Sequence, residues 1–473
     1  METAFPGHRP ENHFGGNGLI GAKMTMRMTD WLRCLFAAGI IMLNTVALAI
    51  EPIFSTHQPV TDPVAAESVP EWRADLAYLS DKIVQLHPDP FFATDEVQFN
   101  ALRDWIDTHI PVMNRSRIIL SFMRLLALVG VQGHDGHSGL WPYQAPANFH
   151  LYPLRLYWFE DGLYVVDAEP DRSLVGARLE SINGHQIDDI LTVVDPFISR
   201  DGPMWVRTWA PIHILSPEFQ NALGFGTDNG SAQFGVTKDG EQRSVALQSM
   251  AHADYHNRFP MVLWTGALPA AEQPRYLHRD DDYYWFEEWP DSRTLYFQYN
   301  ATTRENNAGK SLERVITGLS EIVRSGRVDR LVVDARSNGG GDNTTYGNLL
   351  DFLEKDPFFQ EPGRLYIIIG RITFSAGINF ITDAEQQTDA VFVGEPTGGS
   401  PNQYGDAEQI ALPNSGIRAR VSTQYWNKAG KDDQRLHHEP QLSAPPTAAD
   451  YFQEHDAAVE IILRDQPTNE KLQ

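Results

Sequence analysis

The sequence predicts a multidomain protein of the mixed α/β class. Residues 68–147 carry apolar side chains at helical spacing, and residues 148–250 have the alternating pattern of short strands. From about Tyr283 onward, strand-like and helix-like segments alternate, which predicts a mainly parallel sheet covered by helices. With 473 residues, 42% of them hydrophobic, the chain can form two or three domains with cores of their own. Residues 251–473 are then the α/β core.

The N-terminus has the pattern of an export signal. Arg27 and Arg33 precede a short apolar run that ends near Ala49 in an A-x-A sequence. The run is shorter than the roughly 20 residues that a membrane span needs, so we favour cleavage over an uncleaved anchor. We therefore predict an upstream extension and signal peptide over 1–49 and a linker over 50–67. The mature protein would be periplasmic or secreted, with no stable membrane span.

The composition narrows the possible partners and chemistries. The formal net charge is −24, which argues against a nucleic-acid partner because phosphate binding needs a basic face. Cys34 is the only cysteine and lies within the predicted signal. Its removal would leave a chain without disulfides, a thiol nucleophile or cysteine metal ligands.

A helical domain is expected over residues 68–147. Its loop Gly130-Val-Gln-Gly-His-Asp-Gly-His-Ser-Gly139 places His134, Asp135 and His137 close together among glycines that permit a positive φ. One of these histidines could be a catalytic base, or the loop could be a polar connection between domains. As a metal site the pattern is weak. The helices themselves are predicted over 68–86, about 95–109 and 116–129.

A small β-rich module is expected over residues 148–250. Strands at 154–158 and 163–167 flank a hairpin-type turn, and a second β-rich piece covers 230–246. A helix is predicted over 188–194. Such a module could bind a peptide by adding it as an extra strand, or it could be purely architectural.

Two loops of the α/β core carry its candidate chemistry, because sites of parallel sheets lie at the carboxyl ends of strands. One is 335–342, and the other holds Ser375, between a strand and a helix. A serine there can expose its hydroxyl beside free helix N–H groups, although a plain N-cap serine is also possible. The predicted strands are 294–299, 330–334, 365–369, 390–393 and 418–425, and the predicted helices are 311–324, 346–355, 375–387 and 450–464.

Several of these segments resemble motifs of the C-terminal-processing (tail-specific) serine protease family, which includes the tricorn core protease. Leu331-Val-Val-Asp-Ala-Arg-Ser-Asn-Gly-Gly-Gly341 resembles the family's D-x-R-x-N-x-G-G loop, and Thr373-Phe-Ser-Ala376 resembles its nucleophile turn. Val393-Gly-Glu-Pro-Thr-Gly-Gly-Ser400 and Gly133-His-Asp-Gly-His-Ser138 resemble two further segments, all in the family's order. The resemblance covers most of residues 69–463. It implies a crotonase-like (βαβ) core and a PDZ-like insert.

The resemblance implies roles for individual residues. Ser375 would be the nucleophile, and the N–H of Ala376 with that of Gly339 or Gly340 would form the oxyanion hole. Asn338 and Ser400 lie in the same motifs and are candidates to contact substrate.

The general base is where the sequence departs from the family. The processing branch uses a lysine at the position of Ser400, so a Ser–Lys dyad is not expected. His137 matches the histidine of the tricorn branch, and a histidine suits neutral pH. Gly136 stands where tricorn has a serine, so the group that orients His137 is open. Asp433 and Glu439 are the candidates.

The sequence thus predicts an exported serine peptidase that acts on peptides or proteins and needs no metal or cofactor. Two alternatives remain open. One is a non-catalytic relative that binds peptides or small ligands in the same cleft. The other is a Ser–His esterase, because Thr373-Phe-Ser-Ala-Gly377 is close to G-x-S-x-G and late histidines follow it: His437, His438 and His455.

Overall fold

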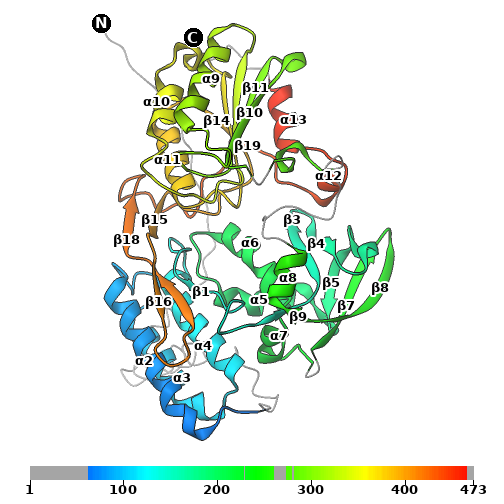
Figure 1. Ribbon diagram of the computed structural model, residues 1–473, viewed down its shortest axis with the longest axis vertical. Helices are drawn as coiled ribbons and strands as arrows, with labels where there is room; N and C mark the ends of the chain where they lie inside the picture. The colour runs from blue at the N-terminus through cyan, green and yellow to red at the C-terminus, as the bar shows by residue number, and fades with distance from the viewer. Residues whose placement is uncertain (1–61, 228–229, 260–272, 280–281, 466–473) are drawn as a thin grey trace, which may run out of the picture. The chain divides into compact units, whose positions relative to one another are not determined.

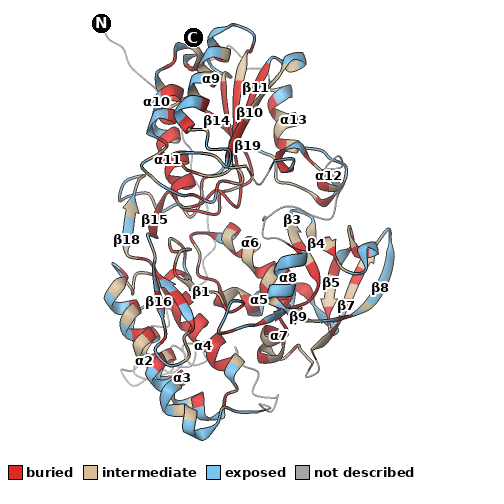
Figure 2. Cartoon of the chain, viewed as in Figure 1, coloured by how far each residue is buried: buried red, intermediate tan, exposed pale blue. Residues whose placement is uncertain are grey.

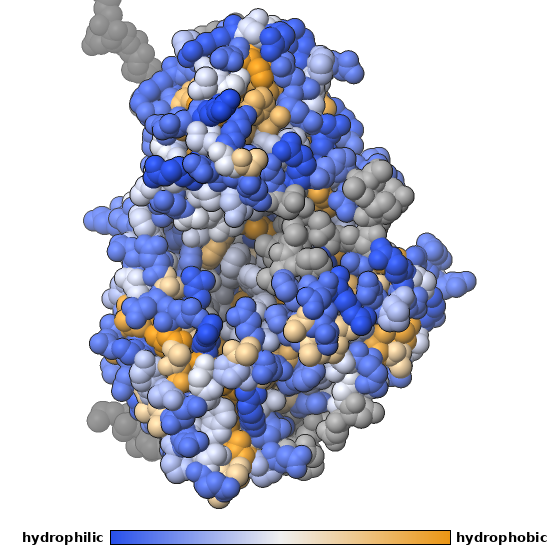
Figure 3. Space-filling model, in the orientation of Figure 1, coloured by the Kyte–Doolittle hydropathy of each residue, from blue (hydrophilic) through white to orange (hydrophobic). Residues whose placement is uncertain are grey.

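The structure, a computed structural model, describes residues 62–227, 230–259, 273–279 and 282–465. The predicted signal peptide and most of the predicted linker lie outside these residues. Within them, none of the helices combines the length and apolar character needed to span a membrane. Figure 3 shows a mostly hydrophilic face with hydrophobic residues in small, separate groups.

The described part of the core contains a six-stranded sheet in the order β10-β11-β12-β13-β14-β19. Only the β10–β11 pair is antiparallel, and the other neighbours run parallel, which confirms the mainly parallel sheet predicted from the alternation. Its strands are β10 (Tyr284–Trp289), β11 (Thr294–Tyr299), β12 (Arg330–Asp334), β13 (Leu365–Ile369), β14 (Val391–Gly394) and β19 (Leu442–Ser443).

Helices cover both faces of this sheet (Figure 1). Alternate strand residues point to opposite sides, so Leu331 and Val333 pack under α9, α10 and α11, while Val332 packs against α13. Figure 2 shows the central strands buried along their length, as expected for a sheet with two covered faces. These helices are α9 (Leu312–Arg324), α10 (Gly347–Lys355), α11 (Ala376–Gln387) and α13 (Ala457–Arg464).

The N-terminal helices agree closely with the predicted ranges: α2 (Val69–Leu86), α3 (Glu96–His109) and α4 (Arg115–Ala127). Distant parts of the chain complete this region. A hairpin of β16 (Glu408–Ala411) and β17 (Arg418–Val421) pairs with β1 (Gly139–Leu140), which follows the helices. The buried carboxylate of Asp75 in α2 accepts the N–H groups of Asn414 and Ser415, at 2.8 Å each, and so fixes the hairpin tip.

The β-rich region contains helices that the strand pattern did not predict. Its sheet follows the predicted strands, but the chain between β6 and β7 also forms α6 and α7. Both helices begin at a proline, whose fixed φ suits the first turn of a helix. The sheet strands are β3 (Leu154–Phe159), β4 (Gly162–Ala168), β5 (Arg178–Ile182), β6 (His185–Gln186), β7 (Ser231–Lys238) and β8 (Glu241–Gln248). The other elements are β2 (His150–Leu151), β9 (Met250–Ala251), α5 (Ile187–Val194), α6 (Pro203–His213), α7 (Pro217–Leu223) and α8 (His252–Arg258).

Two predicted elements of the C-terminal part are wrong in their extent. The strand predicted over 418–425 is two strands, because β18 (Gln424–Asn427) leaves β17 and pairs with β15 (Asn402–Gly405). The helix predicted over 450–464 is also two, α12 (Ala448–Phe452) and α13. Glu454 takes a positive φ of 61° between them, and the Asp456 side chain caps the second helix.

Candidate active site

Ser375 lies at a strained turn between β13 and α11. It is the N-cap of α11 with φ 54° and ψ −127°, a region that residues other than glycine rarely occupy. The turn is held on both sides, because the Phe374 N–H donates to the carbonyl of Asn338 at 2.9 Å and the Gly377 N–H donates to the carbonyl of Phe374. Strain of this kind persists only where the surroundings enforce it, and it is concentrated at functional sites.

His137 meets this serine from 238 residues earlier in the chain. Its Nε2 lies 3.0 Å from Ser375 Oγ, within hydrogen-bond distance. The imidazole stacks on the ring of Phe374 with centroids 4.3 Å apart, and Trp205 of α6 stacks on the opposite side of Phe374 at 3.9 Å. The stack limits rotation of the imidazole and keeps Nε2 directed at the serine hydroxyl.

Asp135 fixes the histidine loop through the main chain. Its buried Oδ1 accepts the N–H groups of His137 and Ser138 at 3.0 and 2.9 Å, and the hydroxyl of Ser422 at 2.8 Å. Its Oδ2 lies 3.1 Å from His87 Nε2. Burial alone would raise the pKa of Asp135, but the hydrogen bonds from His87 and Ser138 outweigh it and lower the pKa below its usual value.

A second buried carboxyl group, Asp201, supports the same loop. Its Oδ1 accepts the Gly136 N–H and its Oδ2 accepts the Ser400 N–H. Burial raises the pKa of Asp201 well above the ordinary value, and the charge of Asp135 adds to the rise. Asp135 therefore carries the negative charge of the loop, while Asp201 favours the neutral form.

The surroundings of His137 hold its imidazole in the neutral form. Burial lowers the pKa of His137 to about 4; Asp135 and the backbone of Tyr404 oppose the shift, and Arg420 adds to it. A ring that is neutral at pH 7 can accept a proton at Nε2. Its buried Nδ1 has no side-chain partner among the described residues, so no carboxylate orients the ring in the manner of a Ser-His-Asp triad.

Two of the three predicted oxyanion donors are free. The N–H groups of Gly339 and Ala376 donate to no other group in the described part of the chain. The Gly340 N–H instead donates to Asn338 Oδ1 at 3.0 Å, which corrects the prediction that it could serve in the hole. Gly340 is needed for a different reason: at its φ of 105°, a Cβ would lie 2.5 Å from Ser375 Cβ and 2.9 Å from the Ala376 nitrogen.

The prediction that Asn338 and Ser400 contact substrate is wrong, because both side chains are fully buried. Asn338 Oδ1 accepts the Gly340 N–H and the Thr302 hydroxyl and so shapes the glycine loop from within. Ser400 donates its hydroxyl to the Asn402 carbonyl at 2.6 Å. Both residues position the loops of the site rather than lining its open space.

Neither carboxylate predicted to orient His137 reaches it. Asp433 is bound by the guanidinium of Arg435, and Glu439 lies 2.8 Å from the ring of His437. Each carboxylate is therefore engaged by a neighbouring side chain and not by His137. The late histidines required by the esterase alternative are also placed elsewhere, since buried His438 Nε2 lies 3.0 Å from the Thr382 hydroxyl. Ser375 meets His137 instead of the late histidines that this alternative named.

Arg371 anchors the loop that leads to Ser375. Its fully buried guanidinium forms a two-pronged pair with Glu395, at 2.8 and 2.7 Å. The same guanidinium donates to the carbonyl of Trp158 in β3 at 2.5 Å. The loop before the serine is thus tied both to the next core strand and to the β-rich region.

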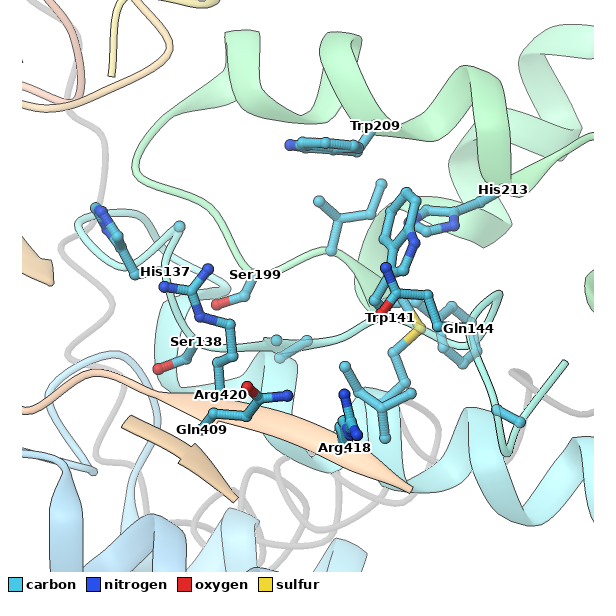
Figure 4. Close-up of a pocket in the computed structure, with 18 of the residues that line it drawn as sticks. His137, Ser138, Trp141, Gln144, Ser199, Trp209, His213, Gln409, Arg418 and Arg420 are labelled. Carbon is cyan, nitrogen blue, oxygen red and sulfur yellow. The ribbon is translucent and has the colours of Figure 1, made fainter. Parts of the chain in front are cut away.

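Ser375 and His137 open into a cavity of about 630 Å³. One side is aromatic, because Trp205, Trp209 and His213 recur at helical spacing along α6. Figure 4 shows Trp141, Trp209 and His213 on that side, with Arg418 and Arg420 rising from the hairpin strand below. The sequence analysis missed these residues. The four-residue spacing on α6 and the alternation in Ile417-Arg-Ala-Arg-Val421 were the signals that could have revealed them.

Comparison with known proteins yields matches in structure alone. No family model and no curated protein matches the sequence. The crystal structure of a CPAF mutant matches with a TM-score of 0.59 at 13% identity, over 85% of this chain and 99% of CPAF. The chain has the fold of CPAF. Mature CPAF complexed with lactacystin matches with a TM-score of 0.56 at 13% identity, over 84% of this chain and 97% of CPAF.

The match to CPAF confirms the predicted mixed α/β class and extends over nearly all of that protein. The photosystem II D1 C-terminal processing protease and the tricorn protease also match, at 14% and 13% identity. The match to the processing protease covers 82% of this chain and 98% of that chain, with a TM-score of 0.38. The match to the tricorn protease covers 84% of this chain and 36% of that chain, with a TM-score of 0.36.

Proposed function

We propose that this chain is an exported serine peptidase in which Ser375 is the nucleophile and His137 the general base. The observation that carries the proposal is the 3.0 Å separation between His137 Nε2 and Ser375 Oγ, across 238 residues of sequence. A nucleophile and base in hydrogen-bond contact, with the nucleophile at a strained helix N-terminus, is the arrangement that acyl transfer requires.

The first half of the reaction forms an acyl-enzyme. Ser375 Oγ attacks the peptide carbonyl while His137 Nε2 accepts the hydroxyl proton. The carbonyl oxygen becomes negative and is stabilised by the N–H group of Gly339 in the glycine loop and by that of Ala376 at the start of α11. The C–N bond then breaks as His137 donates the proton to the leaving amine. Trp205 and Phe374 hold the ring in place through both transfers.

The second half returns the enzyme to its starting state. A water molecule gives a proton to His137 Nε2 and attacks the acyl carbonyl. The second tetrahedral intermediate uses the same two N–H donors. Its collapse releases the carboxylic acid and returns the proton to Ser375 Oγ. Asp135 takes no part in proton transfer; it keeps the His137 backbone fixed.

The finer features of the sequence prediction belong to this proposal. They are the crotonase-like core, the PDZ-like insert over 148–250 and a periplasmic or secreted location. The core sheet with its covering helices and the small antiparallel sheet that precedes it fit the first two. The charged and apolar pattern of residues 27–49 supports export.

One rival function has its own support. The lack of a carboxylate at His137 Nδ1 and the engaged Gly340 N–H would both suit a relative that binds peptides in the same cavity without cleaving them. The two functions differ in a single property, which is the reactivity of the Ser375 hydroxyl.

A fluorophosphonate probe measures that reactivity directly. The wild type should be labelled at one site, and the variant Ser375→Ala should not. His137→Gln should slow labelling by roughly 100- to 10,000-fold, the usual contribution of a general base. His437→Ala is the matched control, since His437 pairs with exposed Glu439 and should leave the rate unchanged. A wild-type protein that resists the probe and leaves peptides intact would favour the binding function.

A further inference from the structure

The cavity at Ser375 is positively charged although the chain is strongly acidic. Arg418 and Arg420 line it, and no aspartate or glutamate is among its lining residues. The chain as a whole has a formal net charge of −24, so the overall composition does not account for a positively charged cavity wall. A cleft lined by one sign of charge concentrates ligands of the opposite sign.

The two guanidiniums are brought together by strand geometry. Residues two apart on a strand share a face, so Arg418 and Arg420 of β17 both face the cavity, while Ala419 between them is buried on the other side. Gln409 lies opposite Arg420 on β16 and also lines the cavity. In Figure 4, Arg420 extends from its strand toward His137, and Arg418 lies further along the same wall.

Both guanidiniums are without a partner in the part of the chain that the structure describes. Neither forms an ion pair or a hydrogen bond there. Arg435, by contrast, is held by Glu385 and Asp433. Two adjacent unpaired guanidiniums offer planar forks of N–H donors, the geometry that binds carboxylates in bidentate fashion.

We propose that Arg418 and Arg420 bind a carboxylate of the peptide substrate beside the bond to be cleaved. This inference rests on the proposed peptidase function and specifies its substrate class. The carboxylate can be the free C-terminus of the peptide or the side chain of an aspartate or glutamate. Gln409 supplies an amide donor at the same wall, and the aromatic side of the cavity is left for apolar parts of the substrate.

Binding to the Ser375→Ala variant tests the carboxylate without requiring catalysis. Three matched short peptides are compared by calorimetry: one with a free C-terminus and no acidic residue, one with a C-terminal amide and one glutamate, and one with the amide and glutamine. At least one carboxylate peptide should bind roughly 10-fold tighter than the neutral peptide. The tighter of the two identifies the source of the carboxylate. Equal binding of all three peptides overturns the proposal.

The guanidiniums are tested by substitution in the same background. Arg418→Gln and Arg420→Gln together should remove the preference for the carboxylate peptide, and added salt should weaken that preference in the parent. Arg103→Gln is the control, because Arg103 is an exposed arginine paired with Asp104 on α3. A double variant that folds and keeps the full preference also overturns the proposal.

The peptide-binding test and the test of the proposed peptidase function can fail independently. Fluorophosphonate labelling of wild-type Ser375 reports on the nucleophile alone, and peptide binding to the Ser375→Ala variant reports on the arginines alone. If the probe does not label the wild type but the Ser375→Ala variant still prefers carboxylate peptides, the peptidase function is wrong and the cleft only binds carboxylates. If the probe labels the wild type but no peptide with a carboxylate binds more tightly than the neutral one, the peptidase function stands and the proposed role of the arginines is wrong.

Discussion

The Asp135 carboxylate holds His137 by its backbone N–H at 3.0 Å and makes no hydrogen bond to its imidazole. The ring is oriented instead by the stack of His137, Phe374 and Trp205 and by the serine hydroxyl itself. The site is therefore a Ser–His pair with a buried carboxylate in a supporting position. Its pH dependence and its tolerance of substitutions should differ from those of a triad.

Activity should depend on the ionisation of His137. The value of kcat/KM for a peptide should fall on the acid side with a midpoint near pH 4, the lowered pKa of His137, because the protonated ring cannot accept the serine proton. An unperturbed histidine would place this midpoint near pH ~6.5. Arg420→Gln removes a positive charge that lowers the pKa, so the midpoint should move to higher pH. A wild-type midpoint at the ordinary value would contradict this description of the site.

The same shift links His137 to stability. The folded pKa lies below that of the unfolded chain, so the unfolded chain binds the extra proton at intermediate pH. The contribution of His137 to the free energy of unfolding is complete above about pH 6.5 and is lost as the pH falls toward 4. Comparing urea unfolding of the wild type and of His137→Gln across this range measures it. A difference that does not vary with pH would count against the shift.

Gly340 should be irreplaceable. In Gly340→Ala the new methyl group meets Ser375 Cβ at 2.5 Å, and the positive φ adds strain, so the serine turn must move away from the oxyanion donors. The fluorophosphonate labelling rate should drop by roughly 100- to 1,000-fold, as when one oxyanion donor is lost. Gly347→Ala is the matched control, because its Cβ meets nothing within 4 Å. Equal labelling of both variants would show that the turn can adapt.

Asp135 should be needed for stability and for the alignment of His137. The backbone N–H of Asp89 donates to His87 Nδ1 at 3.1 Å, so His87 Nε2 carries a hydrogen that points at Asp135 Oδ2. Asp135→Asn places an amide donor against that N–H and should cost about 1–3 kcal/mol of unfolding free energy. Thermal and urea unfolding measure the loss. Asp89→Asn, at an exposed position, should change stability far less.

The buried pair of Arg371 and Glu395 should also be sensitive. Glu395→Gln leaves an uncompensated guanidinium inside the protein, and breaking such a pair costs about 3–5 kcal/mol. Glu460→Gln breaks the exposed pair with Arg464 and should cost less than about 1 kcal/mol. Urea unfolding of the two variants side by side tests the contrast. Equal small losses would mean that water enters the site of the buried pair.

Local signals were sufficient for much of the fold and for the centre of the site. The strands of the core and the helices that alternate with them have strong apolar periodicity, and Ser375 stands at the one strand-to-helix turn where a serine precedes Ala-Gly. His137 could be proposed from a glycine-rich loop and a family resemblance. In each case the informative residues are close together in the sequence.

The rest depends on contacts between distant segments. The exceptions are the pairs Asp433–Arg435 and His437–Glu439, each only two residues apart, which the sequence could have shown. The pairing of β1 with β17 joins Gly139 to Arg420, and no local pattern specifies it. The helices α6 and α7 lie among strands in a stretch rich in aromatic residues, whose preference for strands hides the helical spacing.

That pairing of β1 with β17 has a consequence for the life of the protein. Ser422 contacts Asp135, and Arg420 lies beside Gly139, so the histidine loop acquires its final supports only from residues near position 420. A chain still emerging from the ribosome lacks them. If the proposed peptidase function holds, activity would therefore arise only after residues near position 420 have been made and folded.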